Sequence, residues 1–377
     1  MNIKTTLKAS VAAGALLALV TPMQSAEAGS FKGANESRMD VTWGARIHRA
    51  LRHVDDGEHD GIFNTDGTSA NSEVWVMGSG KLTEGITMGG LLRWDVGKNQ
   101  GTISFGSTTG DETTAADAFA SKYETIYFQH KLGRVTIGDW DEAAANTTNA
   151  TYAGGLSGGG GGSHGAGFHF TTGAEGAFNA TTVGAVFNDT DPTTTNVVRF
   201  DSMNISGFTL GASYSQDGST SGRIQYSGGI GDVTMIARLG YTNANATATA
   251  TTGGNETTGG SVALRHTPSG LSAAIGMGEQ NNHVATDNDP QYFRANVGYA
   301  SKWNSLGTTT FMVHYHETED NVTIGDQAED ITVGVMQALD SVGGRMGIEY
   351  SNISMSDAVG TDYNDIDVVY FETSINF

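Results

Sequence analysis

The chain has 377 residues with 53 glycines, 4 prolines, no cysteine and a formal net charge of -21. The charge argues against nucleic acid as a partner, because phosphate backbones attract lysine and arginine, and the lack of cysteine excludes disulfides and thiolate metal sites. The glycines have no period of three, which excludes collagen, and no internal run of about 18 apolar residues could cross a membrane as a helix.

The N-terminus has the three parts of a secretory signal peptide. Residues 1–8 carry lysines and no acid, residues 11–20 are apolar (VAAGALLALV), and positions 26–28 (AEA) offer small side chains to a signal peptidase. The apolar run is too short to cross a hydrocarbon layer of about 30 Å as a helix. We therefore predict a signal peptide over residues 1–28 and a single exported domain over residues 29–377.

The mature chain begins with a long alternating segment. Between residues 38 and 54, Trp43 and Ile47 would share one face of a strand, and Arg46 and His48 would share the other. A polar loop is expected at 55–72. Similar alternating segments, joined by short turns on one side and long polar loops on the other, follow at 73–80, 86–96, 122–131, 134–140, 196–202, 208–216, 222–227, 232–242, 260–266, 271–278, 291–300, 308–318, 330–338 and 345–354.

The last segment, residues 365–377 (DIDVVYFETSINF), is the most informative. Val369, Phe371 and Ile375 lie on one face, whereas Tyr370 and Glu372 lie on the other, and the chain stops on an aromatic residue. An edge strand with one apolar face needs a partner strand and a lipid-like environment. With this strand the count is about sixteen, and an even count lets a closed sheet begin and end on the same side. The pattern predicts an all-β, transmembrane antiparallel β-barrel.

A soluble secreted β protein is the alternative, because soluble antiparallel sheets also alternate. Against it, the faces opposite the apolar ones carry many charges, such as Arg199, Arg223, Arg294 and Glu349. A barrel around water accommodates such a face, whereas a sandwich would expose it as a very large charged surface.

Four stretches resemble the Gram-negative general porin family: GSGKLTEGITMGGLLRWD (78–95), YFQHKLGRVTIGDWD (127–141), NVVRFDSMNISGFTLGASYS (196–215) and the C-terminal strand. The resemblance implies a sixteen-stranded barrel in the outer membrane, a homotrimer, and passive diffusion of small hydrophilic solutes and ions, with no enzymatic activity. It also implies outer-membrane lipid around the barrel, insertion machinery that reads the terminal Phe377, and a third loop folded into the lumen.

That loop would span about 141–195, longer than is usual in the family. It contains a glycine run at 158–162 and two weakly alternating stretches that could form an extra hairpin. If that hairpin joined the wall, the barrel would have eighteen strands, so this count stays open.

The family's diffusion pores place opposing charges at their narrowest point, which orients dipolar solutes. The resemblance predicts a constriction with a basic wall and an acidic loop, formed by Arg46, His48, Arg52 and Arg93 on one side and Asp139, Asp141 and Glu142 on the other. Strict alternation along 134–140 turns Asp139 outward, so its place in the lumen requires the strand to end before it.

The net charge predicts mild cation selectivity. A substrate-specific channel, with the third loop binding a sugar or an anion, remains the alternative. No cofactor is expected, and calcium in a loop is left open at 55–58, although the glutamate that would close an EF-hand loop is missing.

Overall fold

A computed structural model describes residues 30–31, 39–67, 71–96, 119–153, 167–173, 176–188, 191–244, 255–282 and 288–377. The predicted signal peptide at 1–28 lies outside these residues. Within the described part, no helix is long and apolar enough to cross a membrane.

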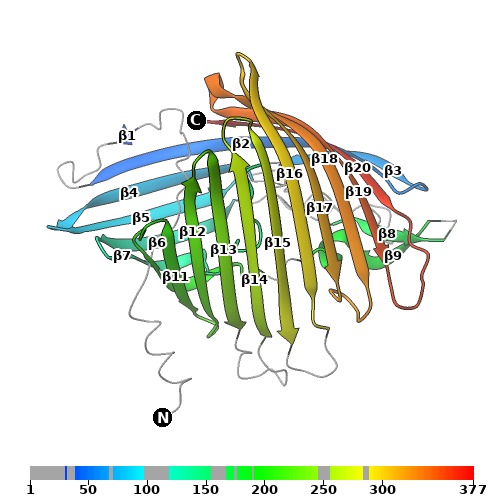
Figure 1. Ribbon diagram of the computed structural model, residues 1–377, viewed down its shortest axis with the longest axis horizontal. Coiled ribbons are helices and arrows are strands. Elements are labelled where there is room, and N and C mark those ends of the chain that lie inside the picture. Colours follow the sequence, from blue (N-terminus) through cyan, green and yellow to red (C-terminus); the bar gives the residue numbers. More distant parts are fainter. Residues whose placement is uncertain are drawn as a thin grey trace, which may run out of the picture.

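Sixteen antiparallel strands close a barrel in the described part of the chain, as the alternating pattern predicts (Figure 1). Each strand pairs with the next one in the wall, and the last returns to the first through pairs such as Leu51 with Phe371. The wall strands are β2 (Asp40–Asp55), β4 (Glu73–Thr83), β5 (Ile86–Asp95), β6 (Ala120–His130), β7 (Gly133–Asp141), β10 (Thr194–Ser202), β11 (Phe208–Ser215), β12 (Thr220–Ile230), β13 (Val233–Ala244), β14 (Asn255–His266), β15 (Leu271–Asn282), β16 (Gln291–Asn304), β17 (Gly307–Glu319), β18 (Gln327–Leu339), β19 (Gly344–Ser356) and β20 (Ile366–Asn376).

Two short strands add to this wall. β1 (Ser30–Phe31) pairs with the start of β2, and β3 (Asp60–Asp66) pairs with its second half. The prediction of a polar loop over 55–72 was therefore wrong in part. The reason is local alternation that the polar flanks conceal, because Phe63 is buried inside the barrel while Ile62 points outward.

The two faces of the wall differ as predicted. On β2, Trp43, Ile47 and Leu51 are 38%, 49% and 49% exposed, whereas the inward His48 and Arg52 are 0% and 1% exposed. A band of apolar side chains outside and charged ones inside is the arrangement of a membrane barrel around a polar lumen.

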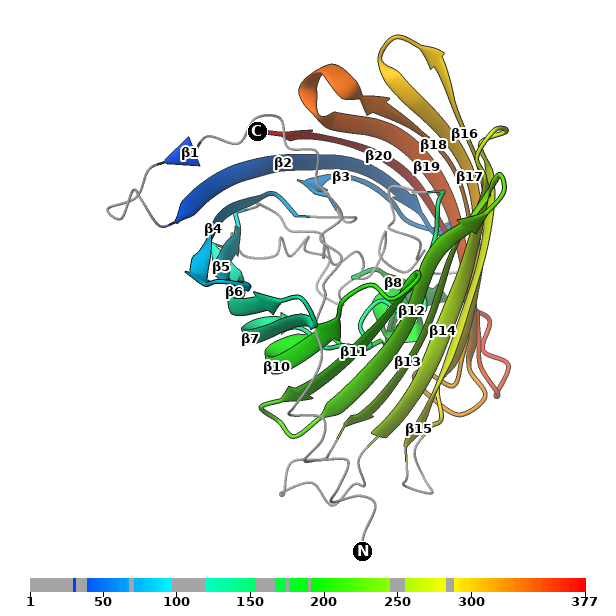
Figure 2. The same ribbon diagram turned by 60° about the vertical axis from the view of Figure 1, so that its left-hand side comes forward.

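The third loop, here residues 142–193, connects β7 to β10 and enters the lumen (Figure 2). Its second half folds into β8 (His169–Thr172), β9 (Ala177–Thr182) and the one-turn helix α2 (Val183–Val186). β8 and β9 pair only with each other in the described sheets, apart from one bridge between Thr172 and Tyr363. The extra hairpin expected from the sequence therefore exists, but it lies inside the barrel, and the wall keeps sixteen strands.

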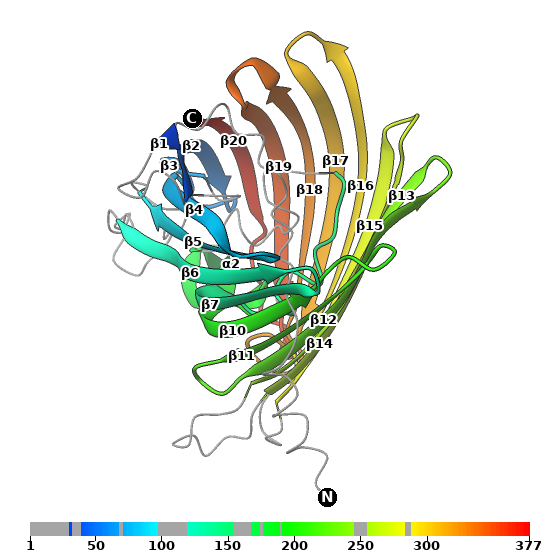
Figure 3. The same ribbon diagram turned by 90° about the vertical axis from the view of Figure 1, so that its left-hand side faces the viewer.

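The connections on one side of the barrel are all short, whereas most of those on the other side are long; the exception is 216–219, between β11 and β12. Between β18 and β19 the connection is a 3-10 turn, η2 (Asp340–Val342), and its following Gly343 has a φ of 59°. This left-handed conformation favours glycine. Figure 3 shows the flank of the barrel on which β5, β6, β7 and β10 face the viewer.

Candidate channel constriction

Two of the predicted basic residues share one carboxylate. Arg46 of β2 and Arg93 of β5 both form ion pairs with Glu73 of β4, which lies between them and is fully buried. The sheet register explains this contact, because Arg46 is directly opposite Glu73, and Arg93 is opposite Trp75, two residues further along β4. Glu73 was not among the predicted site residues.

The other two predicted basic residues lie along the same strand, beside β20. His48 contacts the buried carboxylate of Glu372, which also accepts a hydrogen bond from Arg345 at 3.3 Å. Arg52 lies over the ring of Tyr370, with 5.5 Å from its Cζ to the ring centroid. Alternation in the sequence had already placed Glu372 on the polar face of the last strand. That placement was the one sign in the sequence that Glu372 could contact the inward basic residues.

We call this group the arginine cluster: Arg46, His48, Arg52, Arg93, Arg345, Glu73 and Glu372. The charges of Arg93 and Arg345 lie close enough to act on Arg46. Four guanidinium groups thus gather around two buried carboxylates on this side of the lumen.

Of the predicted acidic residues, Asp141 comes nearest to the basic wall. Its carboxylate accepts hydrogen bonds from Tyr123 at 3.3 Å and from Thr194 at 2.7 Å. The other side of Tyr123 faces Arg93, whose Cζ lies 5.4 Å from the ring centroid. Tyr123 thus links the acidic end of β7 to the arginine cluster.

Glu142 points to a different part of the wall. Its Oε2 accepts a hydrogen bond from Ser219 at 3.3 Å. Burial raises the pKa of the Glu142 carboxyl, against the opposing effect of hydrogen bonds from Ser221 and Ser219. Ser219 lies just before β12 and Ser221 lies within it. The structure therefore does not bring Glu142 to the arginine cluster.

Asp139 stays on the outer face. β7 continues past it to Asp141, so the condition for a lumenal Asp139 is not met, and alternation places it with the exposed Ile137. It is directly opposite Glu124 of β6. The prediction of Asp139 as a constriction residue is corrected for this reason.

The first half of the third loop, residues 142–153, runs across the inner wall and is called the belt. Arg199 fixes its start by donating to the carbonyls of Asp141 and Glu142 at 3.0 and 3.2 Å. Further along, backbone N–H groups of the belt donate to wall serines: Ala143 to Ser213 at 2.9 Å and Ala150 to Ser261 at 3.1 Å. Arg238 donates to the carbonyl of Asn146 at 2.8 Å and Thr151 to Asn296 at 3.0 Å.

The wall beneath the belt has glycines where the two come closest. A Cβ on Gly276 would lie 1.9 Å from the carbonyl oxygen of Thr148, and one on Gly298 would lie 2.1 Å from the Cβ of Ala153. These distances are far below van der Waals contact. The backbone of the belt can therefore lie flat on the wall only because these positions lack side chains.

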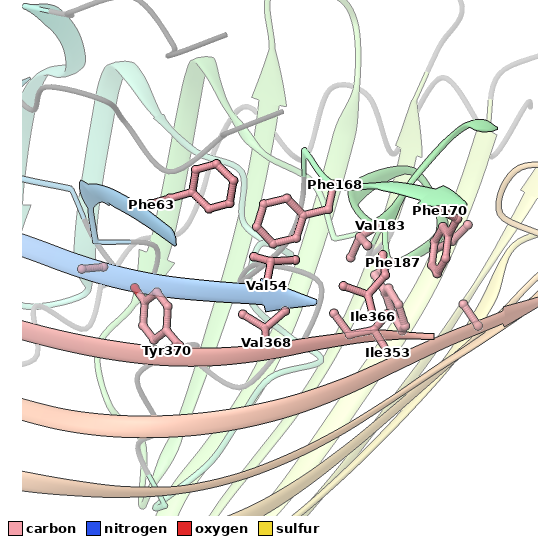
Figure 4. Close-up of a cluster of buried hydrophobic side chains, with 13 residues drawn as sticks. Val54, Phe63, Phe168, Phe170, Val183, Phe187, Ile353, Ile366, Val368 and Tyr370 are labelled. Atoms are coloured by element: carbon pink, nitrogen blue, oxygen red, sulfur yellow. The ribbon is translucent and has the colours of Figure 1, made fainter. Parts of the chain in front are cut away.

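The second half of the loop packs through an apolar cluster inside the barrel (Figure 4). Phe168, Phe170, Val183 and Phe187 of the loop meet wall residues that include Val54, Phe63, Ile353, Ile366 and Val368. Thr318 of β17 also donates to the carbonyl of Val186 at 2.6 Å, and Asn364 donates to Thr171 at 3.0 Å. The loop is thus attached to opposite parts of the wall, by polar contacts at its start and an apolar core at its end.

Among the described residues, no group of three or more histidine and acidic side chains could hold a metal ion. In the loop at 55–58, Asp56 accepts hydrogen bonds from the backbone N–H groups of Glu58 and His59 at 3.0 and 2.6 Å. Its carboxylate thus stabilises a turn.

The sequence profile of a family described as Gram-negative porin matches residues 11–358. No protein with a curated description matches the sequence.

Several solved structures are similar in fold. The outer membrane channel DcaP of Acinetobacter baumannii has a TM-score of 0.60 and 11% identity, covering 93% of this chain and 100% of its own. An anion-selective porin from Comamonas acidovorans has a TM-score of 0.58 and 12% identity, covering 90% and 100%. The trimer form of in-vitro folded OmpT from Vibrio cholerae has a TM-score of 0.58 and 10% identity, covering 90% and 100%. At such low identity these similarities support the barrel fold alone.

Proposed function

Because the chain belongs to the Gram-negative porin family, whose members lie in the outer membrane, we propose that it forms a water-filled channel for passive diffusion of small hydrophilic solutes and ions. The observation that carries this proposal is the polar inner wall, which has arginine, serine and glutamate side chains where a solid barrel would have an apolar core. The family and the fold point to a channel and not to an enzyme.

The inner wall supports a different ion preference from the one expected from the net charge. Arginines point inward on nine wall strands: Arg46, Arg52, Arg93, Arg134, Arg199, Arg223, Arg238, Arg265, Arg294 and Arg345. Inward carboxylates on the wall strands are fewer, and several pair with these arginines, as Glu73 and Asp201 do. Many other acids, such as Glu124 and Asp139, are on the outer face or in loops. The local charge of the narrow section governs ions more than the distant total, so the channel should favour anions weakly over cations.

A homotrimer is part of this proposal. One of the similar structures is described as a trimer form, and the family resemblance implied the same assembly. The signal peptide at 1–28, the surrounding outer-membrane lipid and the insertion machinery that would read Phe377 belong to the same proposal.

Single-channel recording in planar bilayers tests it. Detergent-purified, heat-modifiable protein in a potassium chloride gradient should insert in steps of three conductance levels. The sign of the reversal potential should be that of a channel that passes chloride more readily than potassium. A reversal potential of the opposite sign, showing preference for potassium, would refute the inner-wall argument. The selectivity would then follow the net charge of the chain. Folded protein that forms no channels would refute the channel itself.

A substrate-specific channel is the second candidate. It is favoured by the third loop, which is not a simple constriction segment but carries its own hairpin and apolar core inside the lumen. Saturable reduction of the ion current by one class of solute would distinguish it from a general diffusion pore.

A further inference from the structure

One strip of the inner wall combines arginines with aromatic rings. It lies on β5, β6 and β7, the flank that faces the viewer in Figure 3. Arg93 approaches the ring of Tyr123, with 5.4 Å between Cζ and the centroid, and Arg134 approaches Tyr127 at 3.8 Å. The rings of Tyr123 and Trp140 are 4.6 Å apart and inclined by 51°. We call these five residues the arginine–aromatic strip.

Arg93 is held in place with donors to spare. Its Nε donates to Glu73, and its Cζ lies near the ring of Tyr123, so two contacts position the guanidinium. Within the described residues, its two terminal amino groups make no hydrogen bond, and the side chain is 21% exposed to the lumen. A fixed guanidinium with two adjacent N–H groups matches the two oxygens of a carboxylate.

The rings beside Arg93 supply an apolar surface with two inclined faces. Tyr123 and Trp140 are both partly exposed and come from neighbouring strands, so they form one continuous aromatic patch. A flat ring can lie against one of these two faces over its whole area, whereas a puckered ring touches it only in part.

The described part of the third loop leaves this strip largely uncovered. The belt lies against β10 to β16. The second half of the loop, with the hairpin of β8 and β9, packs on β2, β3 and β17 to β20. Asp141, the last residue of β7 before the loop, accepts hydrogen bonds from Tyr123 of the strip and from Thr194, the first residue of β10 after it.

We propose that the arginine–aromatic strip binds planar carboxylates, with the carboxylate on Arg93 and the attached unsaturated ring against Tyr123 and Trp140. The inference rests on the proposed channel function and narrows its solute class. A neutral sugar could stack on the rings but would leave the donors of Arg93 unused. A small inorganic anion could meet Arg93 but would leave the rings in water. A planar carboxylate uses both.

The test measures block of the chloride current by added benzoate, with cyclohexanecarboxylate as a probe of equal charge and a puckered ring. The wild-type current should fall saturably, and half-block should need about threefold less benzoate than cyclohexanecarboxylate. Arg93→Gln should raise the half-blocking benzoate concentration at least about tenfold. Trp140→Leu should keep carboxylate block but abolish the preference for benzoate.

Arg265→Gln is the matched control, because Arg265 also faces the lumen on β14 but has no aromatic partner among the described residues. Benzoate should block the current of this variant at the same concentration as in the wild type. Arg93→Lys covers the case in which Arg93→Gln fails to fold: it keeps the charge and loses the two-pronged donor, so benzoate block should weaken by severalfold.

Two results would overturn the inference while leaving the channel intact: equal block by the two carboxylates in the wild type, or equal benzoate block in Arg93→Gln and Arg265→Gln. Stronger block by uncharged glucose than by benzoate would also overturn it. A folded wild type with no potassium chloride conductance would instead refute the proposed function.

Discussion

Gly276→Ala should narrow the channel by pushing the belt off the wall. The new Cβ would lie 1.9 Å from the carbonyl oxygen of Thr148, a backbone atom that cannot rotate away. Ordinary carbon–oxygen contact needs about 3.3 Å, so wall and belt must separate by about 1.4 Å. Gly276 lies on β15, which is hydrogen-bonded to β14 on one side and β16 on the other, whereas the belt is held by single contacts such as Ala150 to Ser261 at 3.1 Å. The belt is therefore the part that moves, toward the lumen.

Two measurements check this displacement. The diameter of the largest polyethylene glycol that enters the channel should fall by about 1.4 Å, and the single-channel conductance should fall with it. Overpacking of this kind should also destabilise the fold by about 1–3 kcal/mol, which lowers the temperature at which the folded form is lost in heat-modifiability gels.

Gly222→Ala is the control for the same substitution in a wall strand. Its Cβ would have only the carbonyl oxygen of Gly211 nearby, at 3.8 Å, and Gly222 shares the outward face with Ile224. It should leave size cut-off and conductance unchanged. If folded Gly276→Ala matched Gly222→Ala in both, the reasoning that the glycines set the position of the belt would be refuted.

Three further changes test other contacts. Glu73→Gln removes the carboxylate between Arg46 and Arg93, so the reversal potential should move further to the anion side; a shift to the cation side would contradict the charge assignment. Phe187→Ala removes a buried ring from the apolar cluster and should loosen the hairpin by about 3 kcal/mol, seen as a noisier open-channel current; an unchanged noise level would count against a packed loop. Burial raises the pKa of Glu142 above the usual 4.5, so the folded state binds this proton more tightly than the unfolded chain, and ionisation costs stability as pH rises through the folded pKa. Glu142→Gln should therefore exceed the wild type in heat resistance at neutral pH, with the difference lost below pH 4.5; a constant difference across this range would disprove the assignment.

The wall of the barrel was predictable because its signal is local. In a strand every second side chain shares a face, so Trp43, Ile47 and Leu51 could be assigned outward and Arg52 inward from their spacing alone. The same rule correctly warned that Asp139 would turn outward. It failed for β3, where Phe63, the one buried hydrophobic residue, was hidden among polar residues.

The pairing of charges across strands was not predictable in the same way. Glu73 joins Arg46 to Arg93 because β4 lies between β2 and β5 in a particular register. A shift of that register would give each arginine another neighbour, and a single sequence does not fix the register of long strands.

By itself, the sequence determined the fold class, the inward and outward faces and the length of the third loop, since these depend on composition and on a period of two. Only the tertiary structure decided where that loop lies. Its belt rests on Gly276 and Gly298, and its hairpin on Ile353 and Val368. These contacts join residues more than a hundred positions apart, and whether a glycine faces a neighbouring backbone or open water depends on the closed barrel that brings them together.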